Sequence, residues 1–492
     1  MLPSIAAAPC LHRLLLSRYG LWLIVVLQAL VTCPRLVAEP VNVGTAKQVL
    51  IDGRFVKEPQ GVRLVVNRPR LGREKLIVPE HPWENRLVGA YTSVIQQGDR
   101  IHLWYEARST DGAWSLAYAY SNDGGATFIK PRLGVVEFAG SAANNLVLDN
   151  SLGAHVFLMG PGSPRSEKYG LFIHIRANAK DYGERANFNS AFVSPDGIHW
   201  TPKGDVPFWK RGGDLHLDTQ NVVFWDTRLS RYVAFPRLFN GEMGRAVGRS
   251  ESDTFGNFSR PTRVLVRDAQ DNGLQFYTSA AVQYPFAADA YFAFPAMLNG
   301  ESGSVDIQFV ASRDGVRWLR PDRRPIIHTG FDRCGNEIPY EKGSLYAGYG
   351  LTRQGDQVSL YYTTLACRHV IPPPGTGIIT RAIYRLDGFM SVDAGEPIGQ
   401  FTTPAIVFGG DRLEINFSTS GDGWVEVEIL DAAGKPLAGY GETKADRIAG
   451  DSVARALTWG GRCDVSPLQG RPVRLRFRMH NAKLYAFQFV TT

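Results

Sequence analysis

The sequence lacks the residue patterns that zinc sites, nucleotide-binding sites and serine-nucleophile active sites require. It contains five cysteines in 492 residues, and none is spaced with histidines in the way that zinc ligands are. No glycine-rich phosphate loop of the Walker type is present, and no serine, histidine and aspartate assemble into a convincing catalytic triad. The sequence therefore gives no support to zinc, nucleotide or serine-nucleophile chemistry, and it implies no redox cofactor.

Lysine and arginine are not gathered into runs, although they outnumber the acidic residues. The formal net charge is +7, and Arg13, Arg18 and Arg35 lie in an N-terminal segment that contains no acid. Without that segment the charge falls to about +4. Because no basic stripe forms, the sequence does not predict a nucleic-acid partner.

An apolar run occupies residues 21–31, after Arg13 and Arg18. It is too short to span a bilayer comfortably, and Ala38 offers a small-residue cleavage point. We interpret residues 1–38 as a signal peptide of a secreted or periplasmic protein. Because Arg35 follows the run, an uncleaved N-terminal membrane anchor is the alternative. Membrane contact beyond such an anchor is not predicted.

The cysteines do not define a disulfide framework. Cys10 and Cys33 lie in or beside the leader, which leaves Cys334, Cys367 and Cys463. In an oxidising compartment Cys334 and Cys367 can pair, and Cys463 is then alone. The sequence does not decide whether they do.

The composition favours many short strands joined by tight turns. Aromatic residues make up 11% of the chain and glycine occurs 51 times, and aromatic side chains suit half-buried pleated surfaces. The turn pattern Ser-x-Asp-Gly recurs, with aspartates at Asp123, Asp196 and Asp314 and a degraded copy at Asp253. Their spacing of roughly 60 to 70 residues is that of a four-stranded propeller blade with generous loops.

These turns predict an all-β fold whose first domain, residues 39–394, is a five-bladed β-propeller. Residues 215–253 read as one complete antiparallel unit of strands and turns. The aspartate in each turn accepts backbone N–H bonds, which is a structural role. A strand around Asp52 is expected to join the last segment of the propeller and close the ring.

From about Gly395 the aspartate turns stop and apolar residues alternate with polar ones, as in residues 412–417 and 473–478. Such alternation is typical of strands with one solvated face. Residues 395–492 are therefore predicted to form a separate β-sandwich.

The leader, the Ser-x-Asp-Gly turns, residues 144–148 and 218–226, and the terminal sandwich together resemble secreted bacterial proteins similar to glycoside hydrolase family 32. The wider set is the five-bladed propeller glycosidases, which includes families 43 and 68. The resemblance covers nearly the whole mature chain in outline, and it implies a carbohydrate substrate.

The resemblance also implies three positions for the catalytic acids. Family 32 places a nucleophilic Asp in a Trp-Met-Asn-Asp-Pro-Asn-Gly motif, a stabilising Asp in Arg-Asp-Pro and an acid Glu in Glu-Cys, and none of these motifs occurs here. The nearest positional matches are Asp52, Asp218 and Glu341. This departure leaves fructan hydrolysis unsupported even if the fold is the same.

Glycoside cleavage requires two carboxylates that face each other across the substrate. In a propeller, acids on the innermost strands of different blades converge on the axial funnel, and Asp52, Asp218 and Glu341 each lie on or just before an expected inner strand. We assign Asp52 as nucleophile or base, Glu341 as acid, and Asp218 to hold a hydroxyl or tune the acid. Asp332 and Glu337 compete with Glu341.

Each of these acids also has a structural interpretation. Asp218 can cap buried backbone donors, Asp52 can end a strand before a glycine turn, and Glu341 can lie on a solvated loop. Trp83 can pack in a core, and Glu106 can pair with Arg108. The candidates for substrate binding are Trp83, Glu84, Arg86, Glu106, Asn145, His216, Gln220, Asn221 and Tyr277.

The sequence thus predicts a glycoside hydrolase that acts on an oligosaccharide or polysaccharide in the axial funnel. The alternative is a lectin-like propeller that binds carbohydrate without cleaving it, which the missing invertase motifs favour. A structural metal site built from the same acids is a third possibility. The sugar, the linkage, the anomeric outcome and the oligomeric state are not encoded in any motif.

Overall fold

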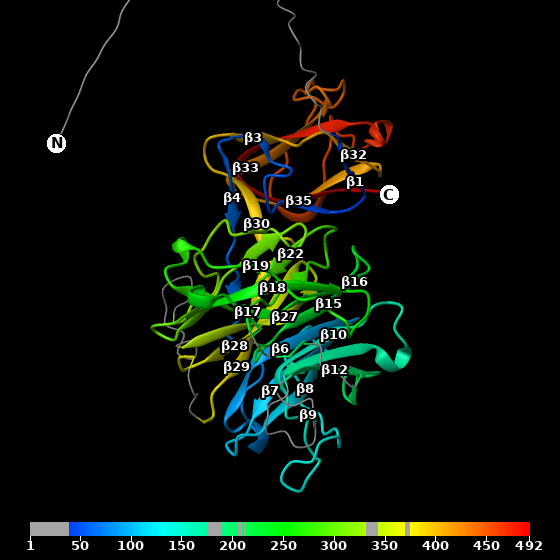
Figure 1. Ribbon diagram of the computed structural model, residues 1–492. Helices are drawn as coiled ribbons and strands as arrows, with labels where there is room; N and C mark the ends of the chain where they lie inside the picture. Colours follow the sequence, from blue (N-terminus) through cyan, green and yellow to red (C-terminus); the bar gives the residue numbers. More distant parts are fainter. Residues whose placement is uncertain are drawn as a thin grey trace, which may run out of the picture. The chain divides into compact units, whose positions relative to one another are not determined.

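The structure is a computed structural model that describes residues 39–174, 188–204, 209–210, 213–215, 217–330, 343–369 and 374–492. In these ranges nearly all regular structure is β-strand (Figure 1), which confirms the all-β prediction. The other regular elements described are short 3-10 helices: η1 (Pro82–Glu84), η2 (Arg165–Glu167), η4 (Gly241–Met243), η5 (Ala269–Asp271) and η6 (Ser466–Leu468). Residues 40–492 form one compact unit.

The described strands between residues 87 and 385, together with β5, lie in one eleven-stranded, two five-stranded and one four-stranded sheet, and we describe them in chain order as five groups. Group 1 contains β6 (Leu87–Gln97), β7 (Arg100–Arg108), β8 (Trp114–Ser121) and β9 (Leu146–Asp149). Group 2 contains β10 (Leu152–Leu158), β11 (Tyr169–His174), β12 (Phe188–Ser194), β13 (Thr201–Pro202) and β14 (Trp209–Lys210). Group 3 contains β15 (Val222–Asp226), β16 (Arg231–Phe235), β17 (Arg237–Phe239), β18 (Arg245–Ser252) and β19 (Thr262–Leu265).

Group 4 consists of two short ladders, and group 5 of three long strands with one short one. Group 4 contains β20 (Leu274–Thr278), β21 (Val282–Gln283), β22 (Tyr291–Ala293), β23 (Ala296–Asn299), β24 (Val305–Ile307), β25 (Val310–Ser312) and β26 (Trp318–Leu319). Group 5 contains β27 (Ser344–Gln354), β28 (Gln357–Leu365), β29 (Ile378–Arg385) and β5 (Arg70–Leu71).

The first strands of neighbouring groups lie against one another. β6 contacts both β10 and β27, and β10 contacts β15 (Figure 1). β6 and β27 run parallel where Ser93 pairs with Tyr349. This close approach requires a glycine, because a Cβ on Gly350 (φ +97°) would lie 2.0 Å from the carbonyl oxygen of Val94. Groups 3 and 4 meet through β18 and β20, and groups 4 and 5 through β24 and β27.

Group 5 is completed by a strand from the beginning of the chain. Leu71 and Arg70 of β5 pair with Ala382 and Ile383 of β29, and Ile77 pairs with Ile379 further along the same strand. The predicted closing strand around Asp52 is therefore wrong. Gln48 and Val49 of β2 (Gln48–Val49) pair instead with β35 (Val473–Val490), where their buried side chains reach apolar partners.

A ten-stranded sheet joins both ends of the described chain. Besides β2 and β35, it contains β1 (Val41–Gly44), β3 (Lys57–Gln60), β4 (Val62–Val66), β30 (Met390–Ala394), β31 (Gly399–Thr402), β32 (Ile406–Phe408), β33 (Arg412–Asp431) and β34 (Asp451–Ala456). β33 and β35 pair along almost their full length, and their alternating apolar side chains build one core. Residues 41–66 thus share a sheet with strands from residues 390–490, whereas the predicted domain limits 1–38, 39–394 and 395–492 stay predictions.

The recurring aspartates order their own turns. The carboxylate of Asp196 accepts hydrogen bonds of 2.9 Å from the backbone N–H groups of Ile198 and His199. Asp314 accepts equivalent bonds of 2.9 and 2.8 Å from Val316 and Arg317. The degraded copy differs, because Asp253 pairs with Arg231 and its side chain is 82% exposed.

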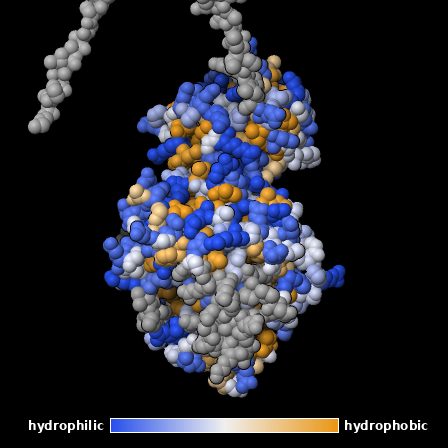
Figure 2. All heavy atoms as spheres, viewed as in Figure 1, coloured by the Kyte–Doolittle hydropathy of each residue, from blue (hydrophilic) through white to orange (hydrophobic). Residues whose placement is uncertain are grey.

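The visible surface is mixed in polarity, with apolar residues scattered among polar ones (Figure 2). Within the described ranges, no helix is both long enough and apolar enough to cross a membrane. The leader, residues 1–38, lies outside those ranges.

Candidate functional site

Asp218 lies in a loop that is held in shape by a buried amide. The side chain of Asn221 donates hydrogen bonds of 2.8 Å to the carbonyl oxygens of Leu217 and Thr219. Its own oxygen accepts a 2.9 Å bond from the backbone N–H of Arg237 in β17. Asn221 therefore fixes the loop that carries Asp218 and, in the same place, the strand that carries Arg237.

Asp218 and Arg237 form an ion pair across this loop. The Asp218 side chain is 37% exposed and that of Arg237 only 5%. A guanidinium presents several N–H donors in a fixed plane and so orients a carboxylate well. The pair leaves one face of the carboxyl group accessible while the arginine stays buried beneath it.

Buried tyrosines from three groups form a floor beside Asp218, which we call the tyrosine floor: Tyr91, Tyr277 and Tyr346. The Tyr91 hydroxyl lies 3.2 Å from that of Tyr277 and accepts a 3.0 Å hydrogen bond from the hydroxyl of Thr219. Tyr91, Tyr277 and Tyr346 lie on β6, β20 and β27. The floor therefore brings together residues that are far apart in the sequence.

His369 lies on this floor. Its Nδ1 is 2.6 Å from the hydroxyl of Tyr346, and its ring centre is 4.3 Å from that of Tyr277. Burial, together with the charges of Arg245 and Arg237, lowers the pKa of His369 to about 4. The imidazole is therefore neutral at ordinary pH.

A second arginine flanks the same tyrosine ring. The guanidinium carbons of Arg237 and Arg245 lie 5.0 and 5.3 Å from the centre of the Tyr277 ring, within the range of a cation–π contact. Arg245, the first residue of β18, also donates a 3.0 Å hydrogen bond to the side-chain oxygen of Gln275. Burial and the charge of Arg237 lower the pKa of Arg245.

Glu106 lies beneath this site and is fully buried. Its carboxylate accepts a 2.5 Å hydrogen bond from the backbone N–H of Gly153, and its charge acts on Tyr91. Gly153 has φ +65°, and a Cβ there would lie 2.2 Å from the carbonyl oxygen of Thr219. The predicted substrate-binding residue Glu106 thus lies behind the floor, where it fixes the backbone against the Asp218 loop.

Gln220 and Tyr277 also lie at this site, but both are buried. The amide of Gln220 donates hydrogen bonds of 3.0 and 3.2 Å to the carbonyl oxygens of Thr92 and Ala154. Gln220 therefore ties the start of group 3, just before β15, to β6 and β10, the first strands of groups 1 and 2. Asp218, Gln220, Asn221, Tyr277 and Glu106 are the predicted site residues that the structure brings together.

Three other predicted residues form a separate buried cluster. The indole N–H of Trp83 donates a 2.9 Å hydrogen bond to Asn145, and Trp83 packs against a core of group 1. Tyr105 donates bonds to Glu84 at 2.5 Å, and Asn145 donates one to the Tyr105 hydroxyl at 2.8 Å. Lys130 neutralises Glu84 at 2.9 Å. Asn145 therefore bonds directly to Trp83 and is linked to Glu84 through the hydroxyl of Tyr105.

Asp52 is held by arginines of its own. Arg313 contacts its carboxylate at 3.0 and 3.2 Å, and the backbone N–H of Arg54 donates a 3.0 Å bond. Burial raises the pKa of Asp52, but the hydrogen bonds and charge of Arg313 outweigh it and hold the pKa below its usual value. Among the described residues, Asp52 thus has partners other than Arg237, the partner of Asp218.

The remaining predicted residues are less constrained. Arg86 is half-buried, and its charge acts on the nearby thiol of Cys367. Cys367 carries a free thiol, as does Cys463, whereas Cys334, the other half of the disulfide that the sequence leaves open, lies outside the described residues. His216, Glu341 and its competitors Asp332 and Glu337 lie outside the described residues.

The sequence analysis missed Tyr91, Tyr346, Arg237, Arg245 and His369. A signal for the first was present, because Tyr91-Thr92-Ser93 and Tyr277-Thr278-Ser279 repeat the same three residues on β6 and at the end of β20. The two arginines have no such local signal, since they reach Tyr277 only through the folding of group 3 onto group 4.

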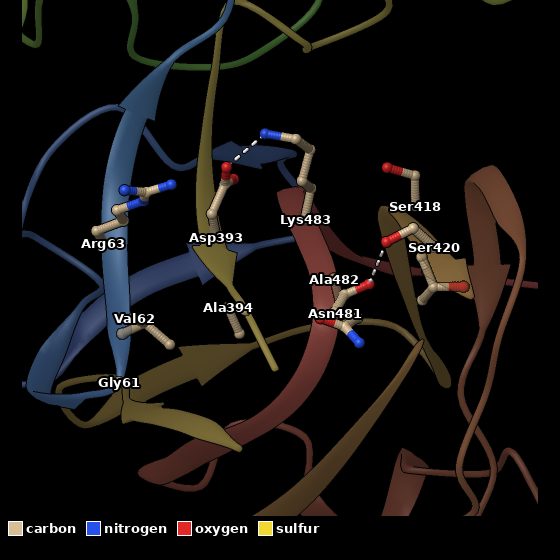
Figure 3. Close-up of a pocket in the computed structure, with 12 residues that line it drawn as sticks. Gly61, Val62, Arg63, Asp393, Ala394, Ser418, Ser420, Asn481, Ala482 and Lys483 are labelled. Carbon is tan, nitrogen blue, oxygen red and sulfur yellow. Dashed lines mark hydrogen bonds and ion pairs between the residues drawn. The ribbon is translucent and has the colours of Figure 1, made fainter. Parts of the chain in front are cut away.

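Two of the pockets that described residues line lie elsewhere. One, of about 1020 Å³, is lined by later parts of the first strands, including Ile95, Trp225 and Leu351. The other, of about 460 Å³, lies in the ten-stranded sheet (Figure 3). There Lys483 and Asp393 form an ion pair, and Ser420 and Asn481 lie beside it. Neither lining contains an uncompensated pair of carboxylates. In the described ranges, no three His, Cys, Asp or Glu side chains gather as a metal site.

No protein-family model matches the sequence, and no curated protein does. A solved structure described as a glycoside hydrolase is similar with a TM-score of 0.47 at 14% identity, covering 64% of this chain and 92% of its own. A thermostable family-43 glycoside hydrolase has a TM-score of 0.42 at 13% identity, covering 62% and 95%. The α-L-arabinofuranosidase PaAbf62A from Podospora anserina, solved with cellotriose, has a TM-score of 0.42 at 16% identity, covering 63% and 95%. At these identities, function has to be argued from the chain's own residues.

Proposed function

We propose that the chain is a glycoside hydrolase that acts on an oligosaccharide or polysaccharide at Asp218. The observation that carries this proposal is the accessible Asp218 carboxylate, oriented by the buried Arg237 beside the tyrosine floor. Asp218, Arg245 and His369 are the partly exposed groups of this site. Converging polar side chains on a rigid floor are suited to fixing the hydroxyls of a sugar.

Hydrolysis of a glycosidic bond requires a second carboxylate about 5 to 10 Å from the first. One carboxyl group protonates the leaving oxygen, and the other acts as nucleophile, activates water or stabilises the developing charge. We assign the acid to Glu341 from the sequence, and Asp218 to the ionised role. The assignment of Asp52 as nucleophile or base stays a prediction, for which the Discussion gives a test.

The proposal includes the wider architecture. Five groups of strands in chain order, contacts between successive groups, and a first strand that pairs with the last group support a five-bladed propeller. The tyrosine floor then lies on the propeller axis. A β-sandwich at residues 395–492 and secretion through a signal peptide at residues 1–38 complete the proposal.

A carbohydrate-binding protein without catalytic activity is the second candidate. One observation favours it: among the described side chains of the site, Asp218 is the partly exposed carboxylate, whereas Glu106 is fully buried. A site with one accessible acid can hold a sugar but lacks the pair that cleavage requires.

The test is incubation of the mature protein with a panel of plant, algal and microbial glycans, followed by analysis of released sugars. Asp218→Asn is compared with Asp356→Asn, because Asp356 is exposed in the turn between β27 and β28. Product from the native protein and from Asp356→Asn, with a loss of at least about a hundredfold in Asp218→Asn, supports the hydrolase.

The outcomes separate the two candidates. Binding to a glycan without any released sugar, with affinity lost in Asp218→Asn, supports the non-catalytic binding protein. Full activity in Asp218→Asn overturns the assignment of the site. Thermal unfolding of both variants shows whether the fold is retained.

A further inference from the structure

Among the described residues of the site, the guanidiniums of Arg237 and Arg245 lie near one partly exposed carboxylate, that of Asp218. Arg237 and Arg245 both stack against Tyr277, and the Asp218 carboxylate pairs with Arg237. Within the described ranges, the contacts of the Arg245 guanidinium are the side-chain oxygen of Gln275 and the Tyr277 ring, and no carboxylate forms an ion pair with it. No described carboxylate therefore lies within ion-pair distance of this half-buried guanidinium, although the charge of Asp218 acts on it.

Arg86 adds further positive charge. It is half-buried, its Nε is buried without a hydrogen-bond partner, and no described carboxylate pairs with it. Its charge acts on the thiol of Cys367, which packs against the cluster that contains Tyr346 of the floor. Glu106 is fully buried and already accepts a hydrogen bond from the backbone N–H of Gly153.

The positive charge of the two arginines also affects the protonation of His369. Burial and the charges of Arg245 and Arg237 keep His369 neutral. Burying two guanidiniums beside one ring costs desolvation free energy, and a bound anion offsets that cost. Guanidinium groups bind the planar or multi-oxygen anions carboxylate and sulfate through paired N–H donors.

We propose that the substrate carries an anionic group, a uronate carboxylate or a sulfate ester, which binds to Arg245 at the side of the site near Tyr277. The proposal rests on the carbohydrate site described under Proposed function. Arg245 acts as a specificity determinant, because a neutral glycan leaves its charge unmatched. Arg86 contributes to the same positive field.

The test measures binding by affinity electrophoresis with two matched pairs of probes. Polygalacturonate is compared with carboxyl-reduced polygalacturonate, and dextran sulfate with dextran. The proteins are the native chain, Arg245→Gln, Arg245→Lys and Arg455→Gln. Arg455 is exposed on β34 of the ten-stranded sheet, so its variant removes one charge without touching the site.

We expect the native chain to bind the anionic member of at least one pair about tenfold or more tightly than the neutral member, which corresponds to about 1.4 kcal/mol. Arg245→Gln loses this preference, Arg245→Lys keeps part of it, and Arg455→Gln keeps all of it. Preference within the galacturonate pair alone identifies a carboxylate, and preference within the dextran pair alone identifies a sulfate.

Equal affinity for both members of each pair, or no binding to any probe, overturns the proposal. A preference that falls equally in Arg245→Gln and Arg455→Gln shows non-specific attraction of polyanions and also overturns it. Released sugar is assayed separately. Anionic preference without hydrolysis removes the hydrolase and leaves this inference standing, whereas hydrolysis of neutral glycans alone does the reverse.

Discussion

The side-chain amide of Gln220 donates a 3.0 Å hydrogen bond to the carbonyl oxygen of Thr92, a residue 128 positions earlier in the chain. A second bond of 3.2 Å reaches Ala154. The amide is buried, so water cannot replace either bond. This contact ties the loop before β15 to β10 and to β6, the strand that carries Tyr91 of the tyrosine floor.

Replacing Gln220 with alanine is expected to lower the free energy of unfolding by about 1 to 3 kcal/mol, because two buried carbonyl groups lose their donor. Chemical denaturation measures the change. Gln357→Ala, at an exposed position at the start of β28, is the matched control and should stay within about 0.5 kcal/mol of the native value. Equal stabilities for the two variants would contradict the structural role of Gln220.

Acid should destabilise the protein through His155. Burial lowers the pKa of His155 to about 3 from its usual 6.5, and its Nε2 lies 2.7 Å from the carbonyl oxygen of Val223. Between those pH values the unfolded chain binds a proton that the folded chain does not, so the free energy of unfolding falls as pH falls. At pH 4 the loss is about 3 kcal/mol.

The measurement is denaturation of the native chain and His155→Gln at pH 7 and pH 4. The difference between them isolates His155 from the other histidines of lowered pKa, His102 and His369. His199→Gln is the control, since His199 is 67% exposed. If His155→Gln loses as much stability on acidification as the native chain, the buried neutral imidazole is excluded.

Asp52→Asn should weaken the fold rather than the chemistry. The substitution removes the negative charge that Arg313 contacts, at a carboxylate whose side chain is 14% exposed, and should cost about 1 to 3 kcal/mol. Because the folded pKa of Asp52 lies below 3.8, its contribution is present above that pH and is lost as pH falls through the folded value.

Glycan hydrolysis and unfolding are measured together for Asp52→Asn, with Asp99→Asn at an exposed position as control. Hydrolysis near the native rate, with reduced stability, makes Asp52 a structural residue. A loss of hydrolysis with native stability restores the catalytic assignment made from the sequence.

Arg245→Gln should raise the pKa of His369 above about 4. Burial is the main cause of the lowered pKa and remains in the variant, whereas the charge of Arg245, the next cause, is removed. Proton NMR titration of the imidazole resonances measures the shift, and Arg455→Gln provides the control. An unchanged His369 pKa would mean that the positive field does not extend from Arg245 to the floor.

The sequence predicted the features of this protein that depend on local pattern. The turns of Asp196 and Asp314 form as expected, because serine, aspartate and glycine within a few residues are sufficient to order them. The predicted unit at residues 215–253 contains antiparallel strands, among them β16 at Arg231–Phe235. Asp218 was found because polar residues interrupt an apolar run just before β15.

Long-range pairing accounts for the failures. The short strand before Asp52 pairs with β35 more than 400 residues later, and nothing within residues 48–56 signals that partner. Trp83, Glu84 and Asn145 have the residue types of a sugar site. In the folded chain, however, their polar atoms bond within one cluster that includes Tyr105. Pattern shows which residues can bind a sugar, and only packing shows which of them remain accessible.

The pairing of both chain ends has a consequence for folding kinetics. β1, β2, β3 and β4 pair with strands beyond residue 390, and β5 pairs with β29. During synthesis, residues 41–71 therefore have no partner until most of the chain that follows them exists, and such non-local pairings fold slowly. The unpaired edges of residues 41–71 are exposed for that period. The protein should consequently refold slowly in vitro and require protection of its N-terminal strands until the last group is complete.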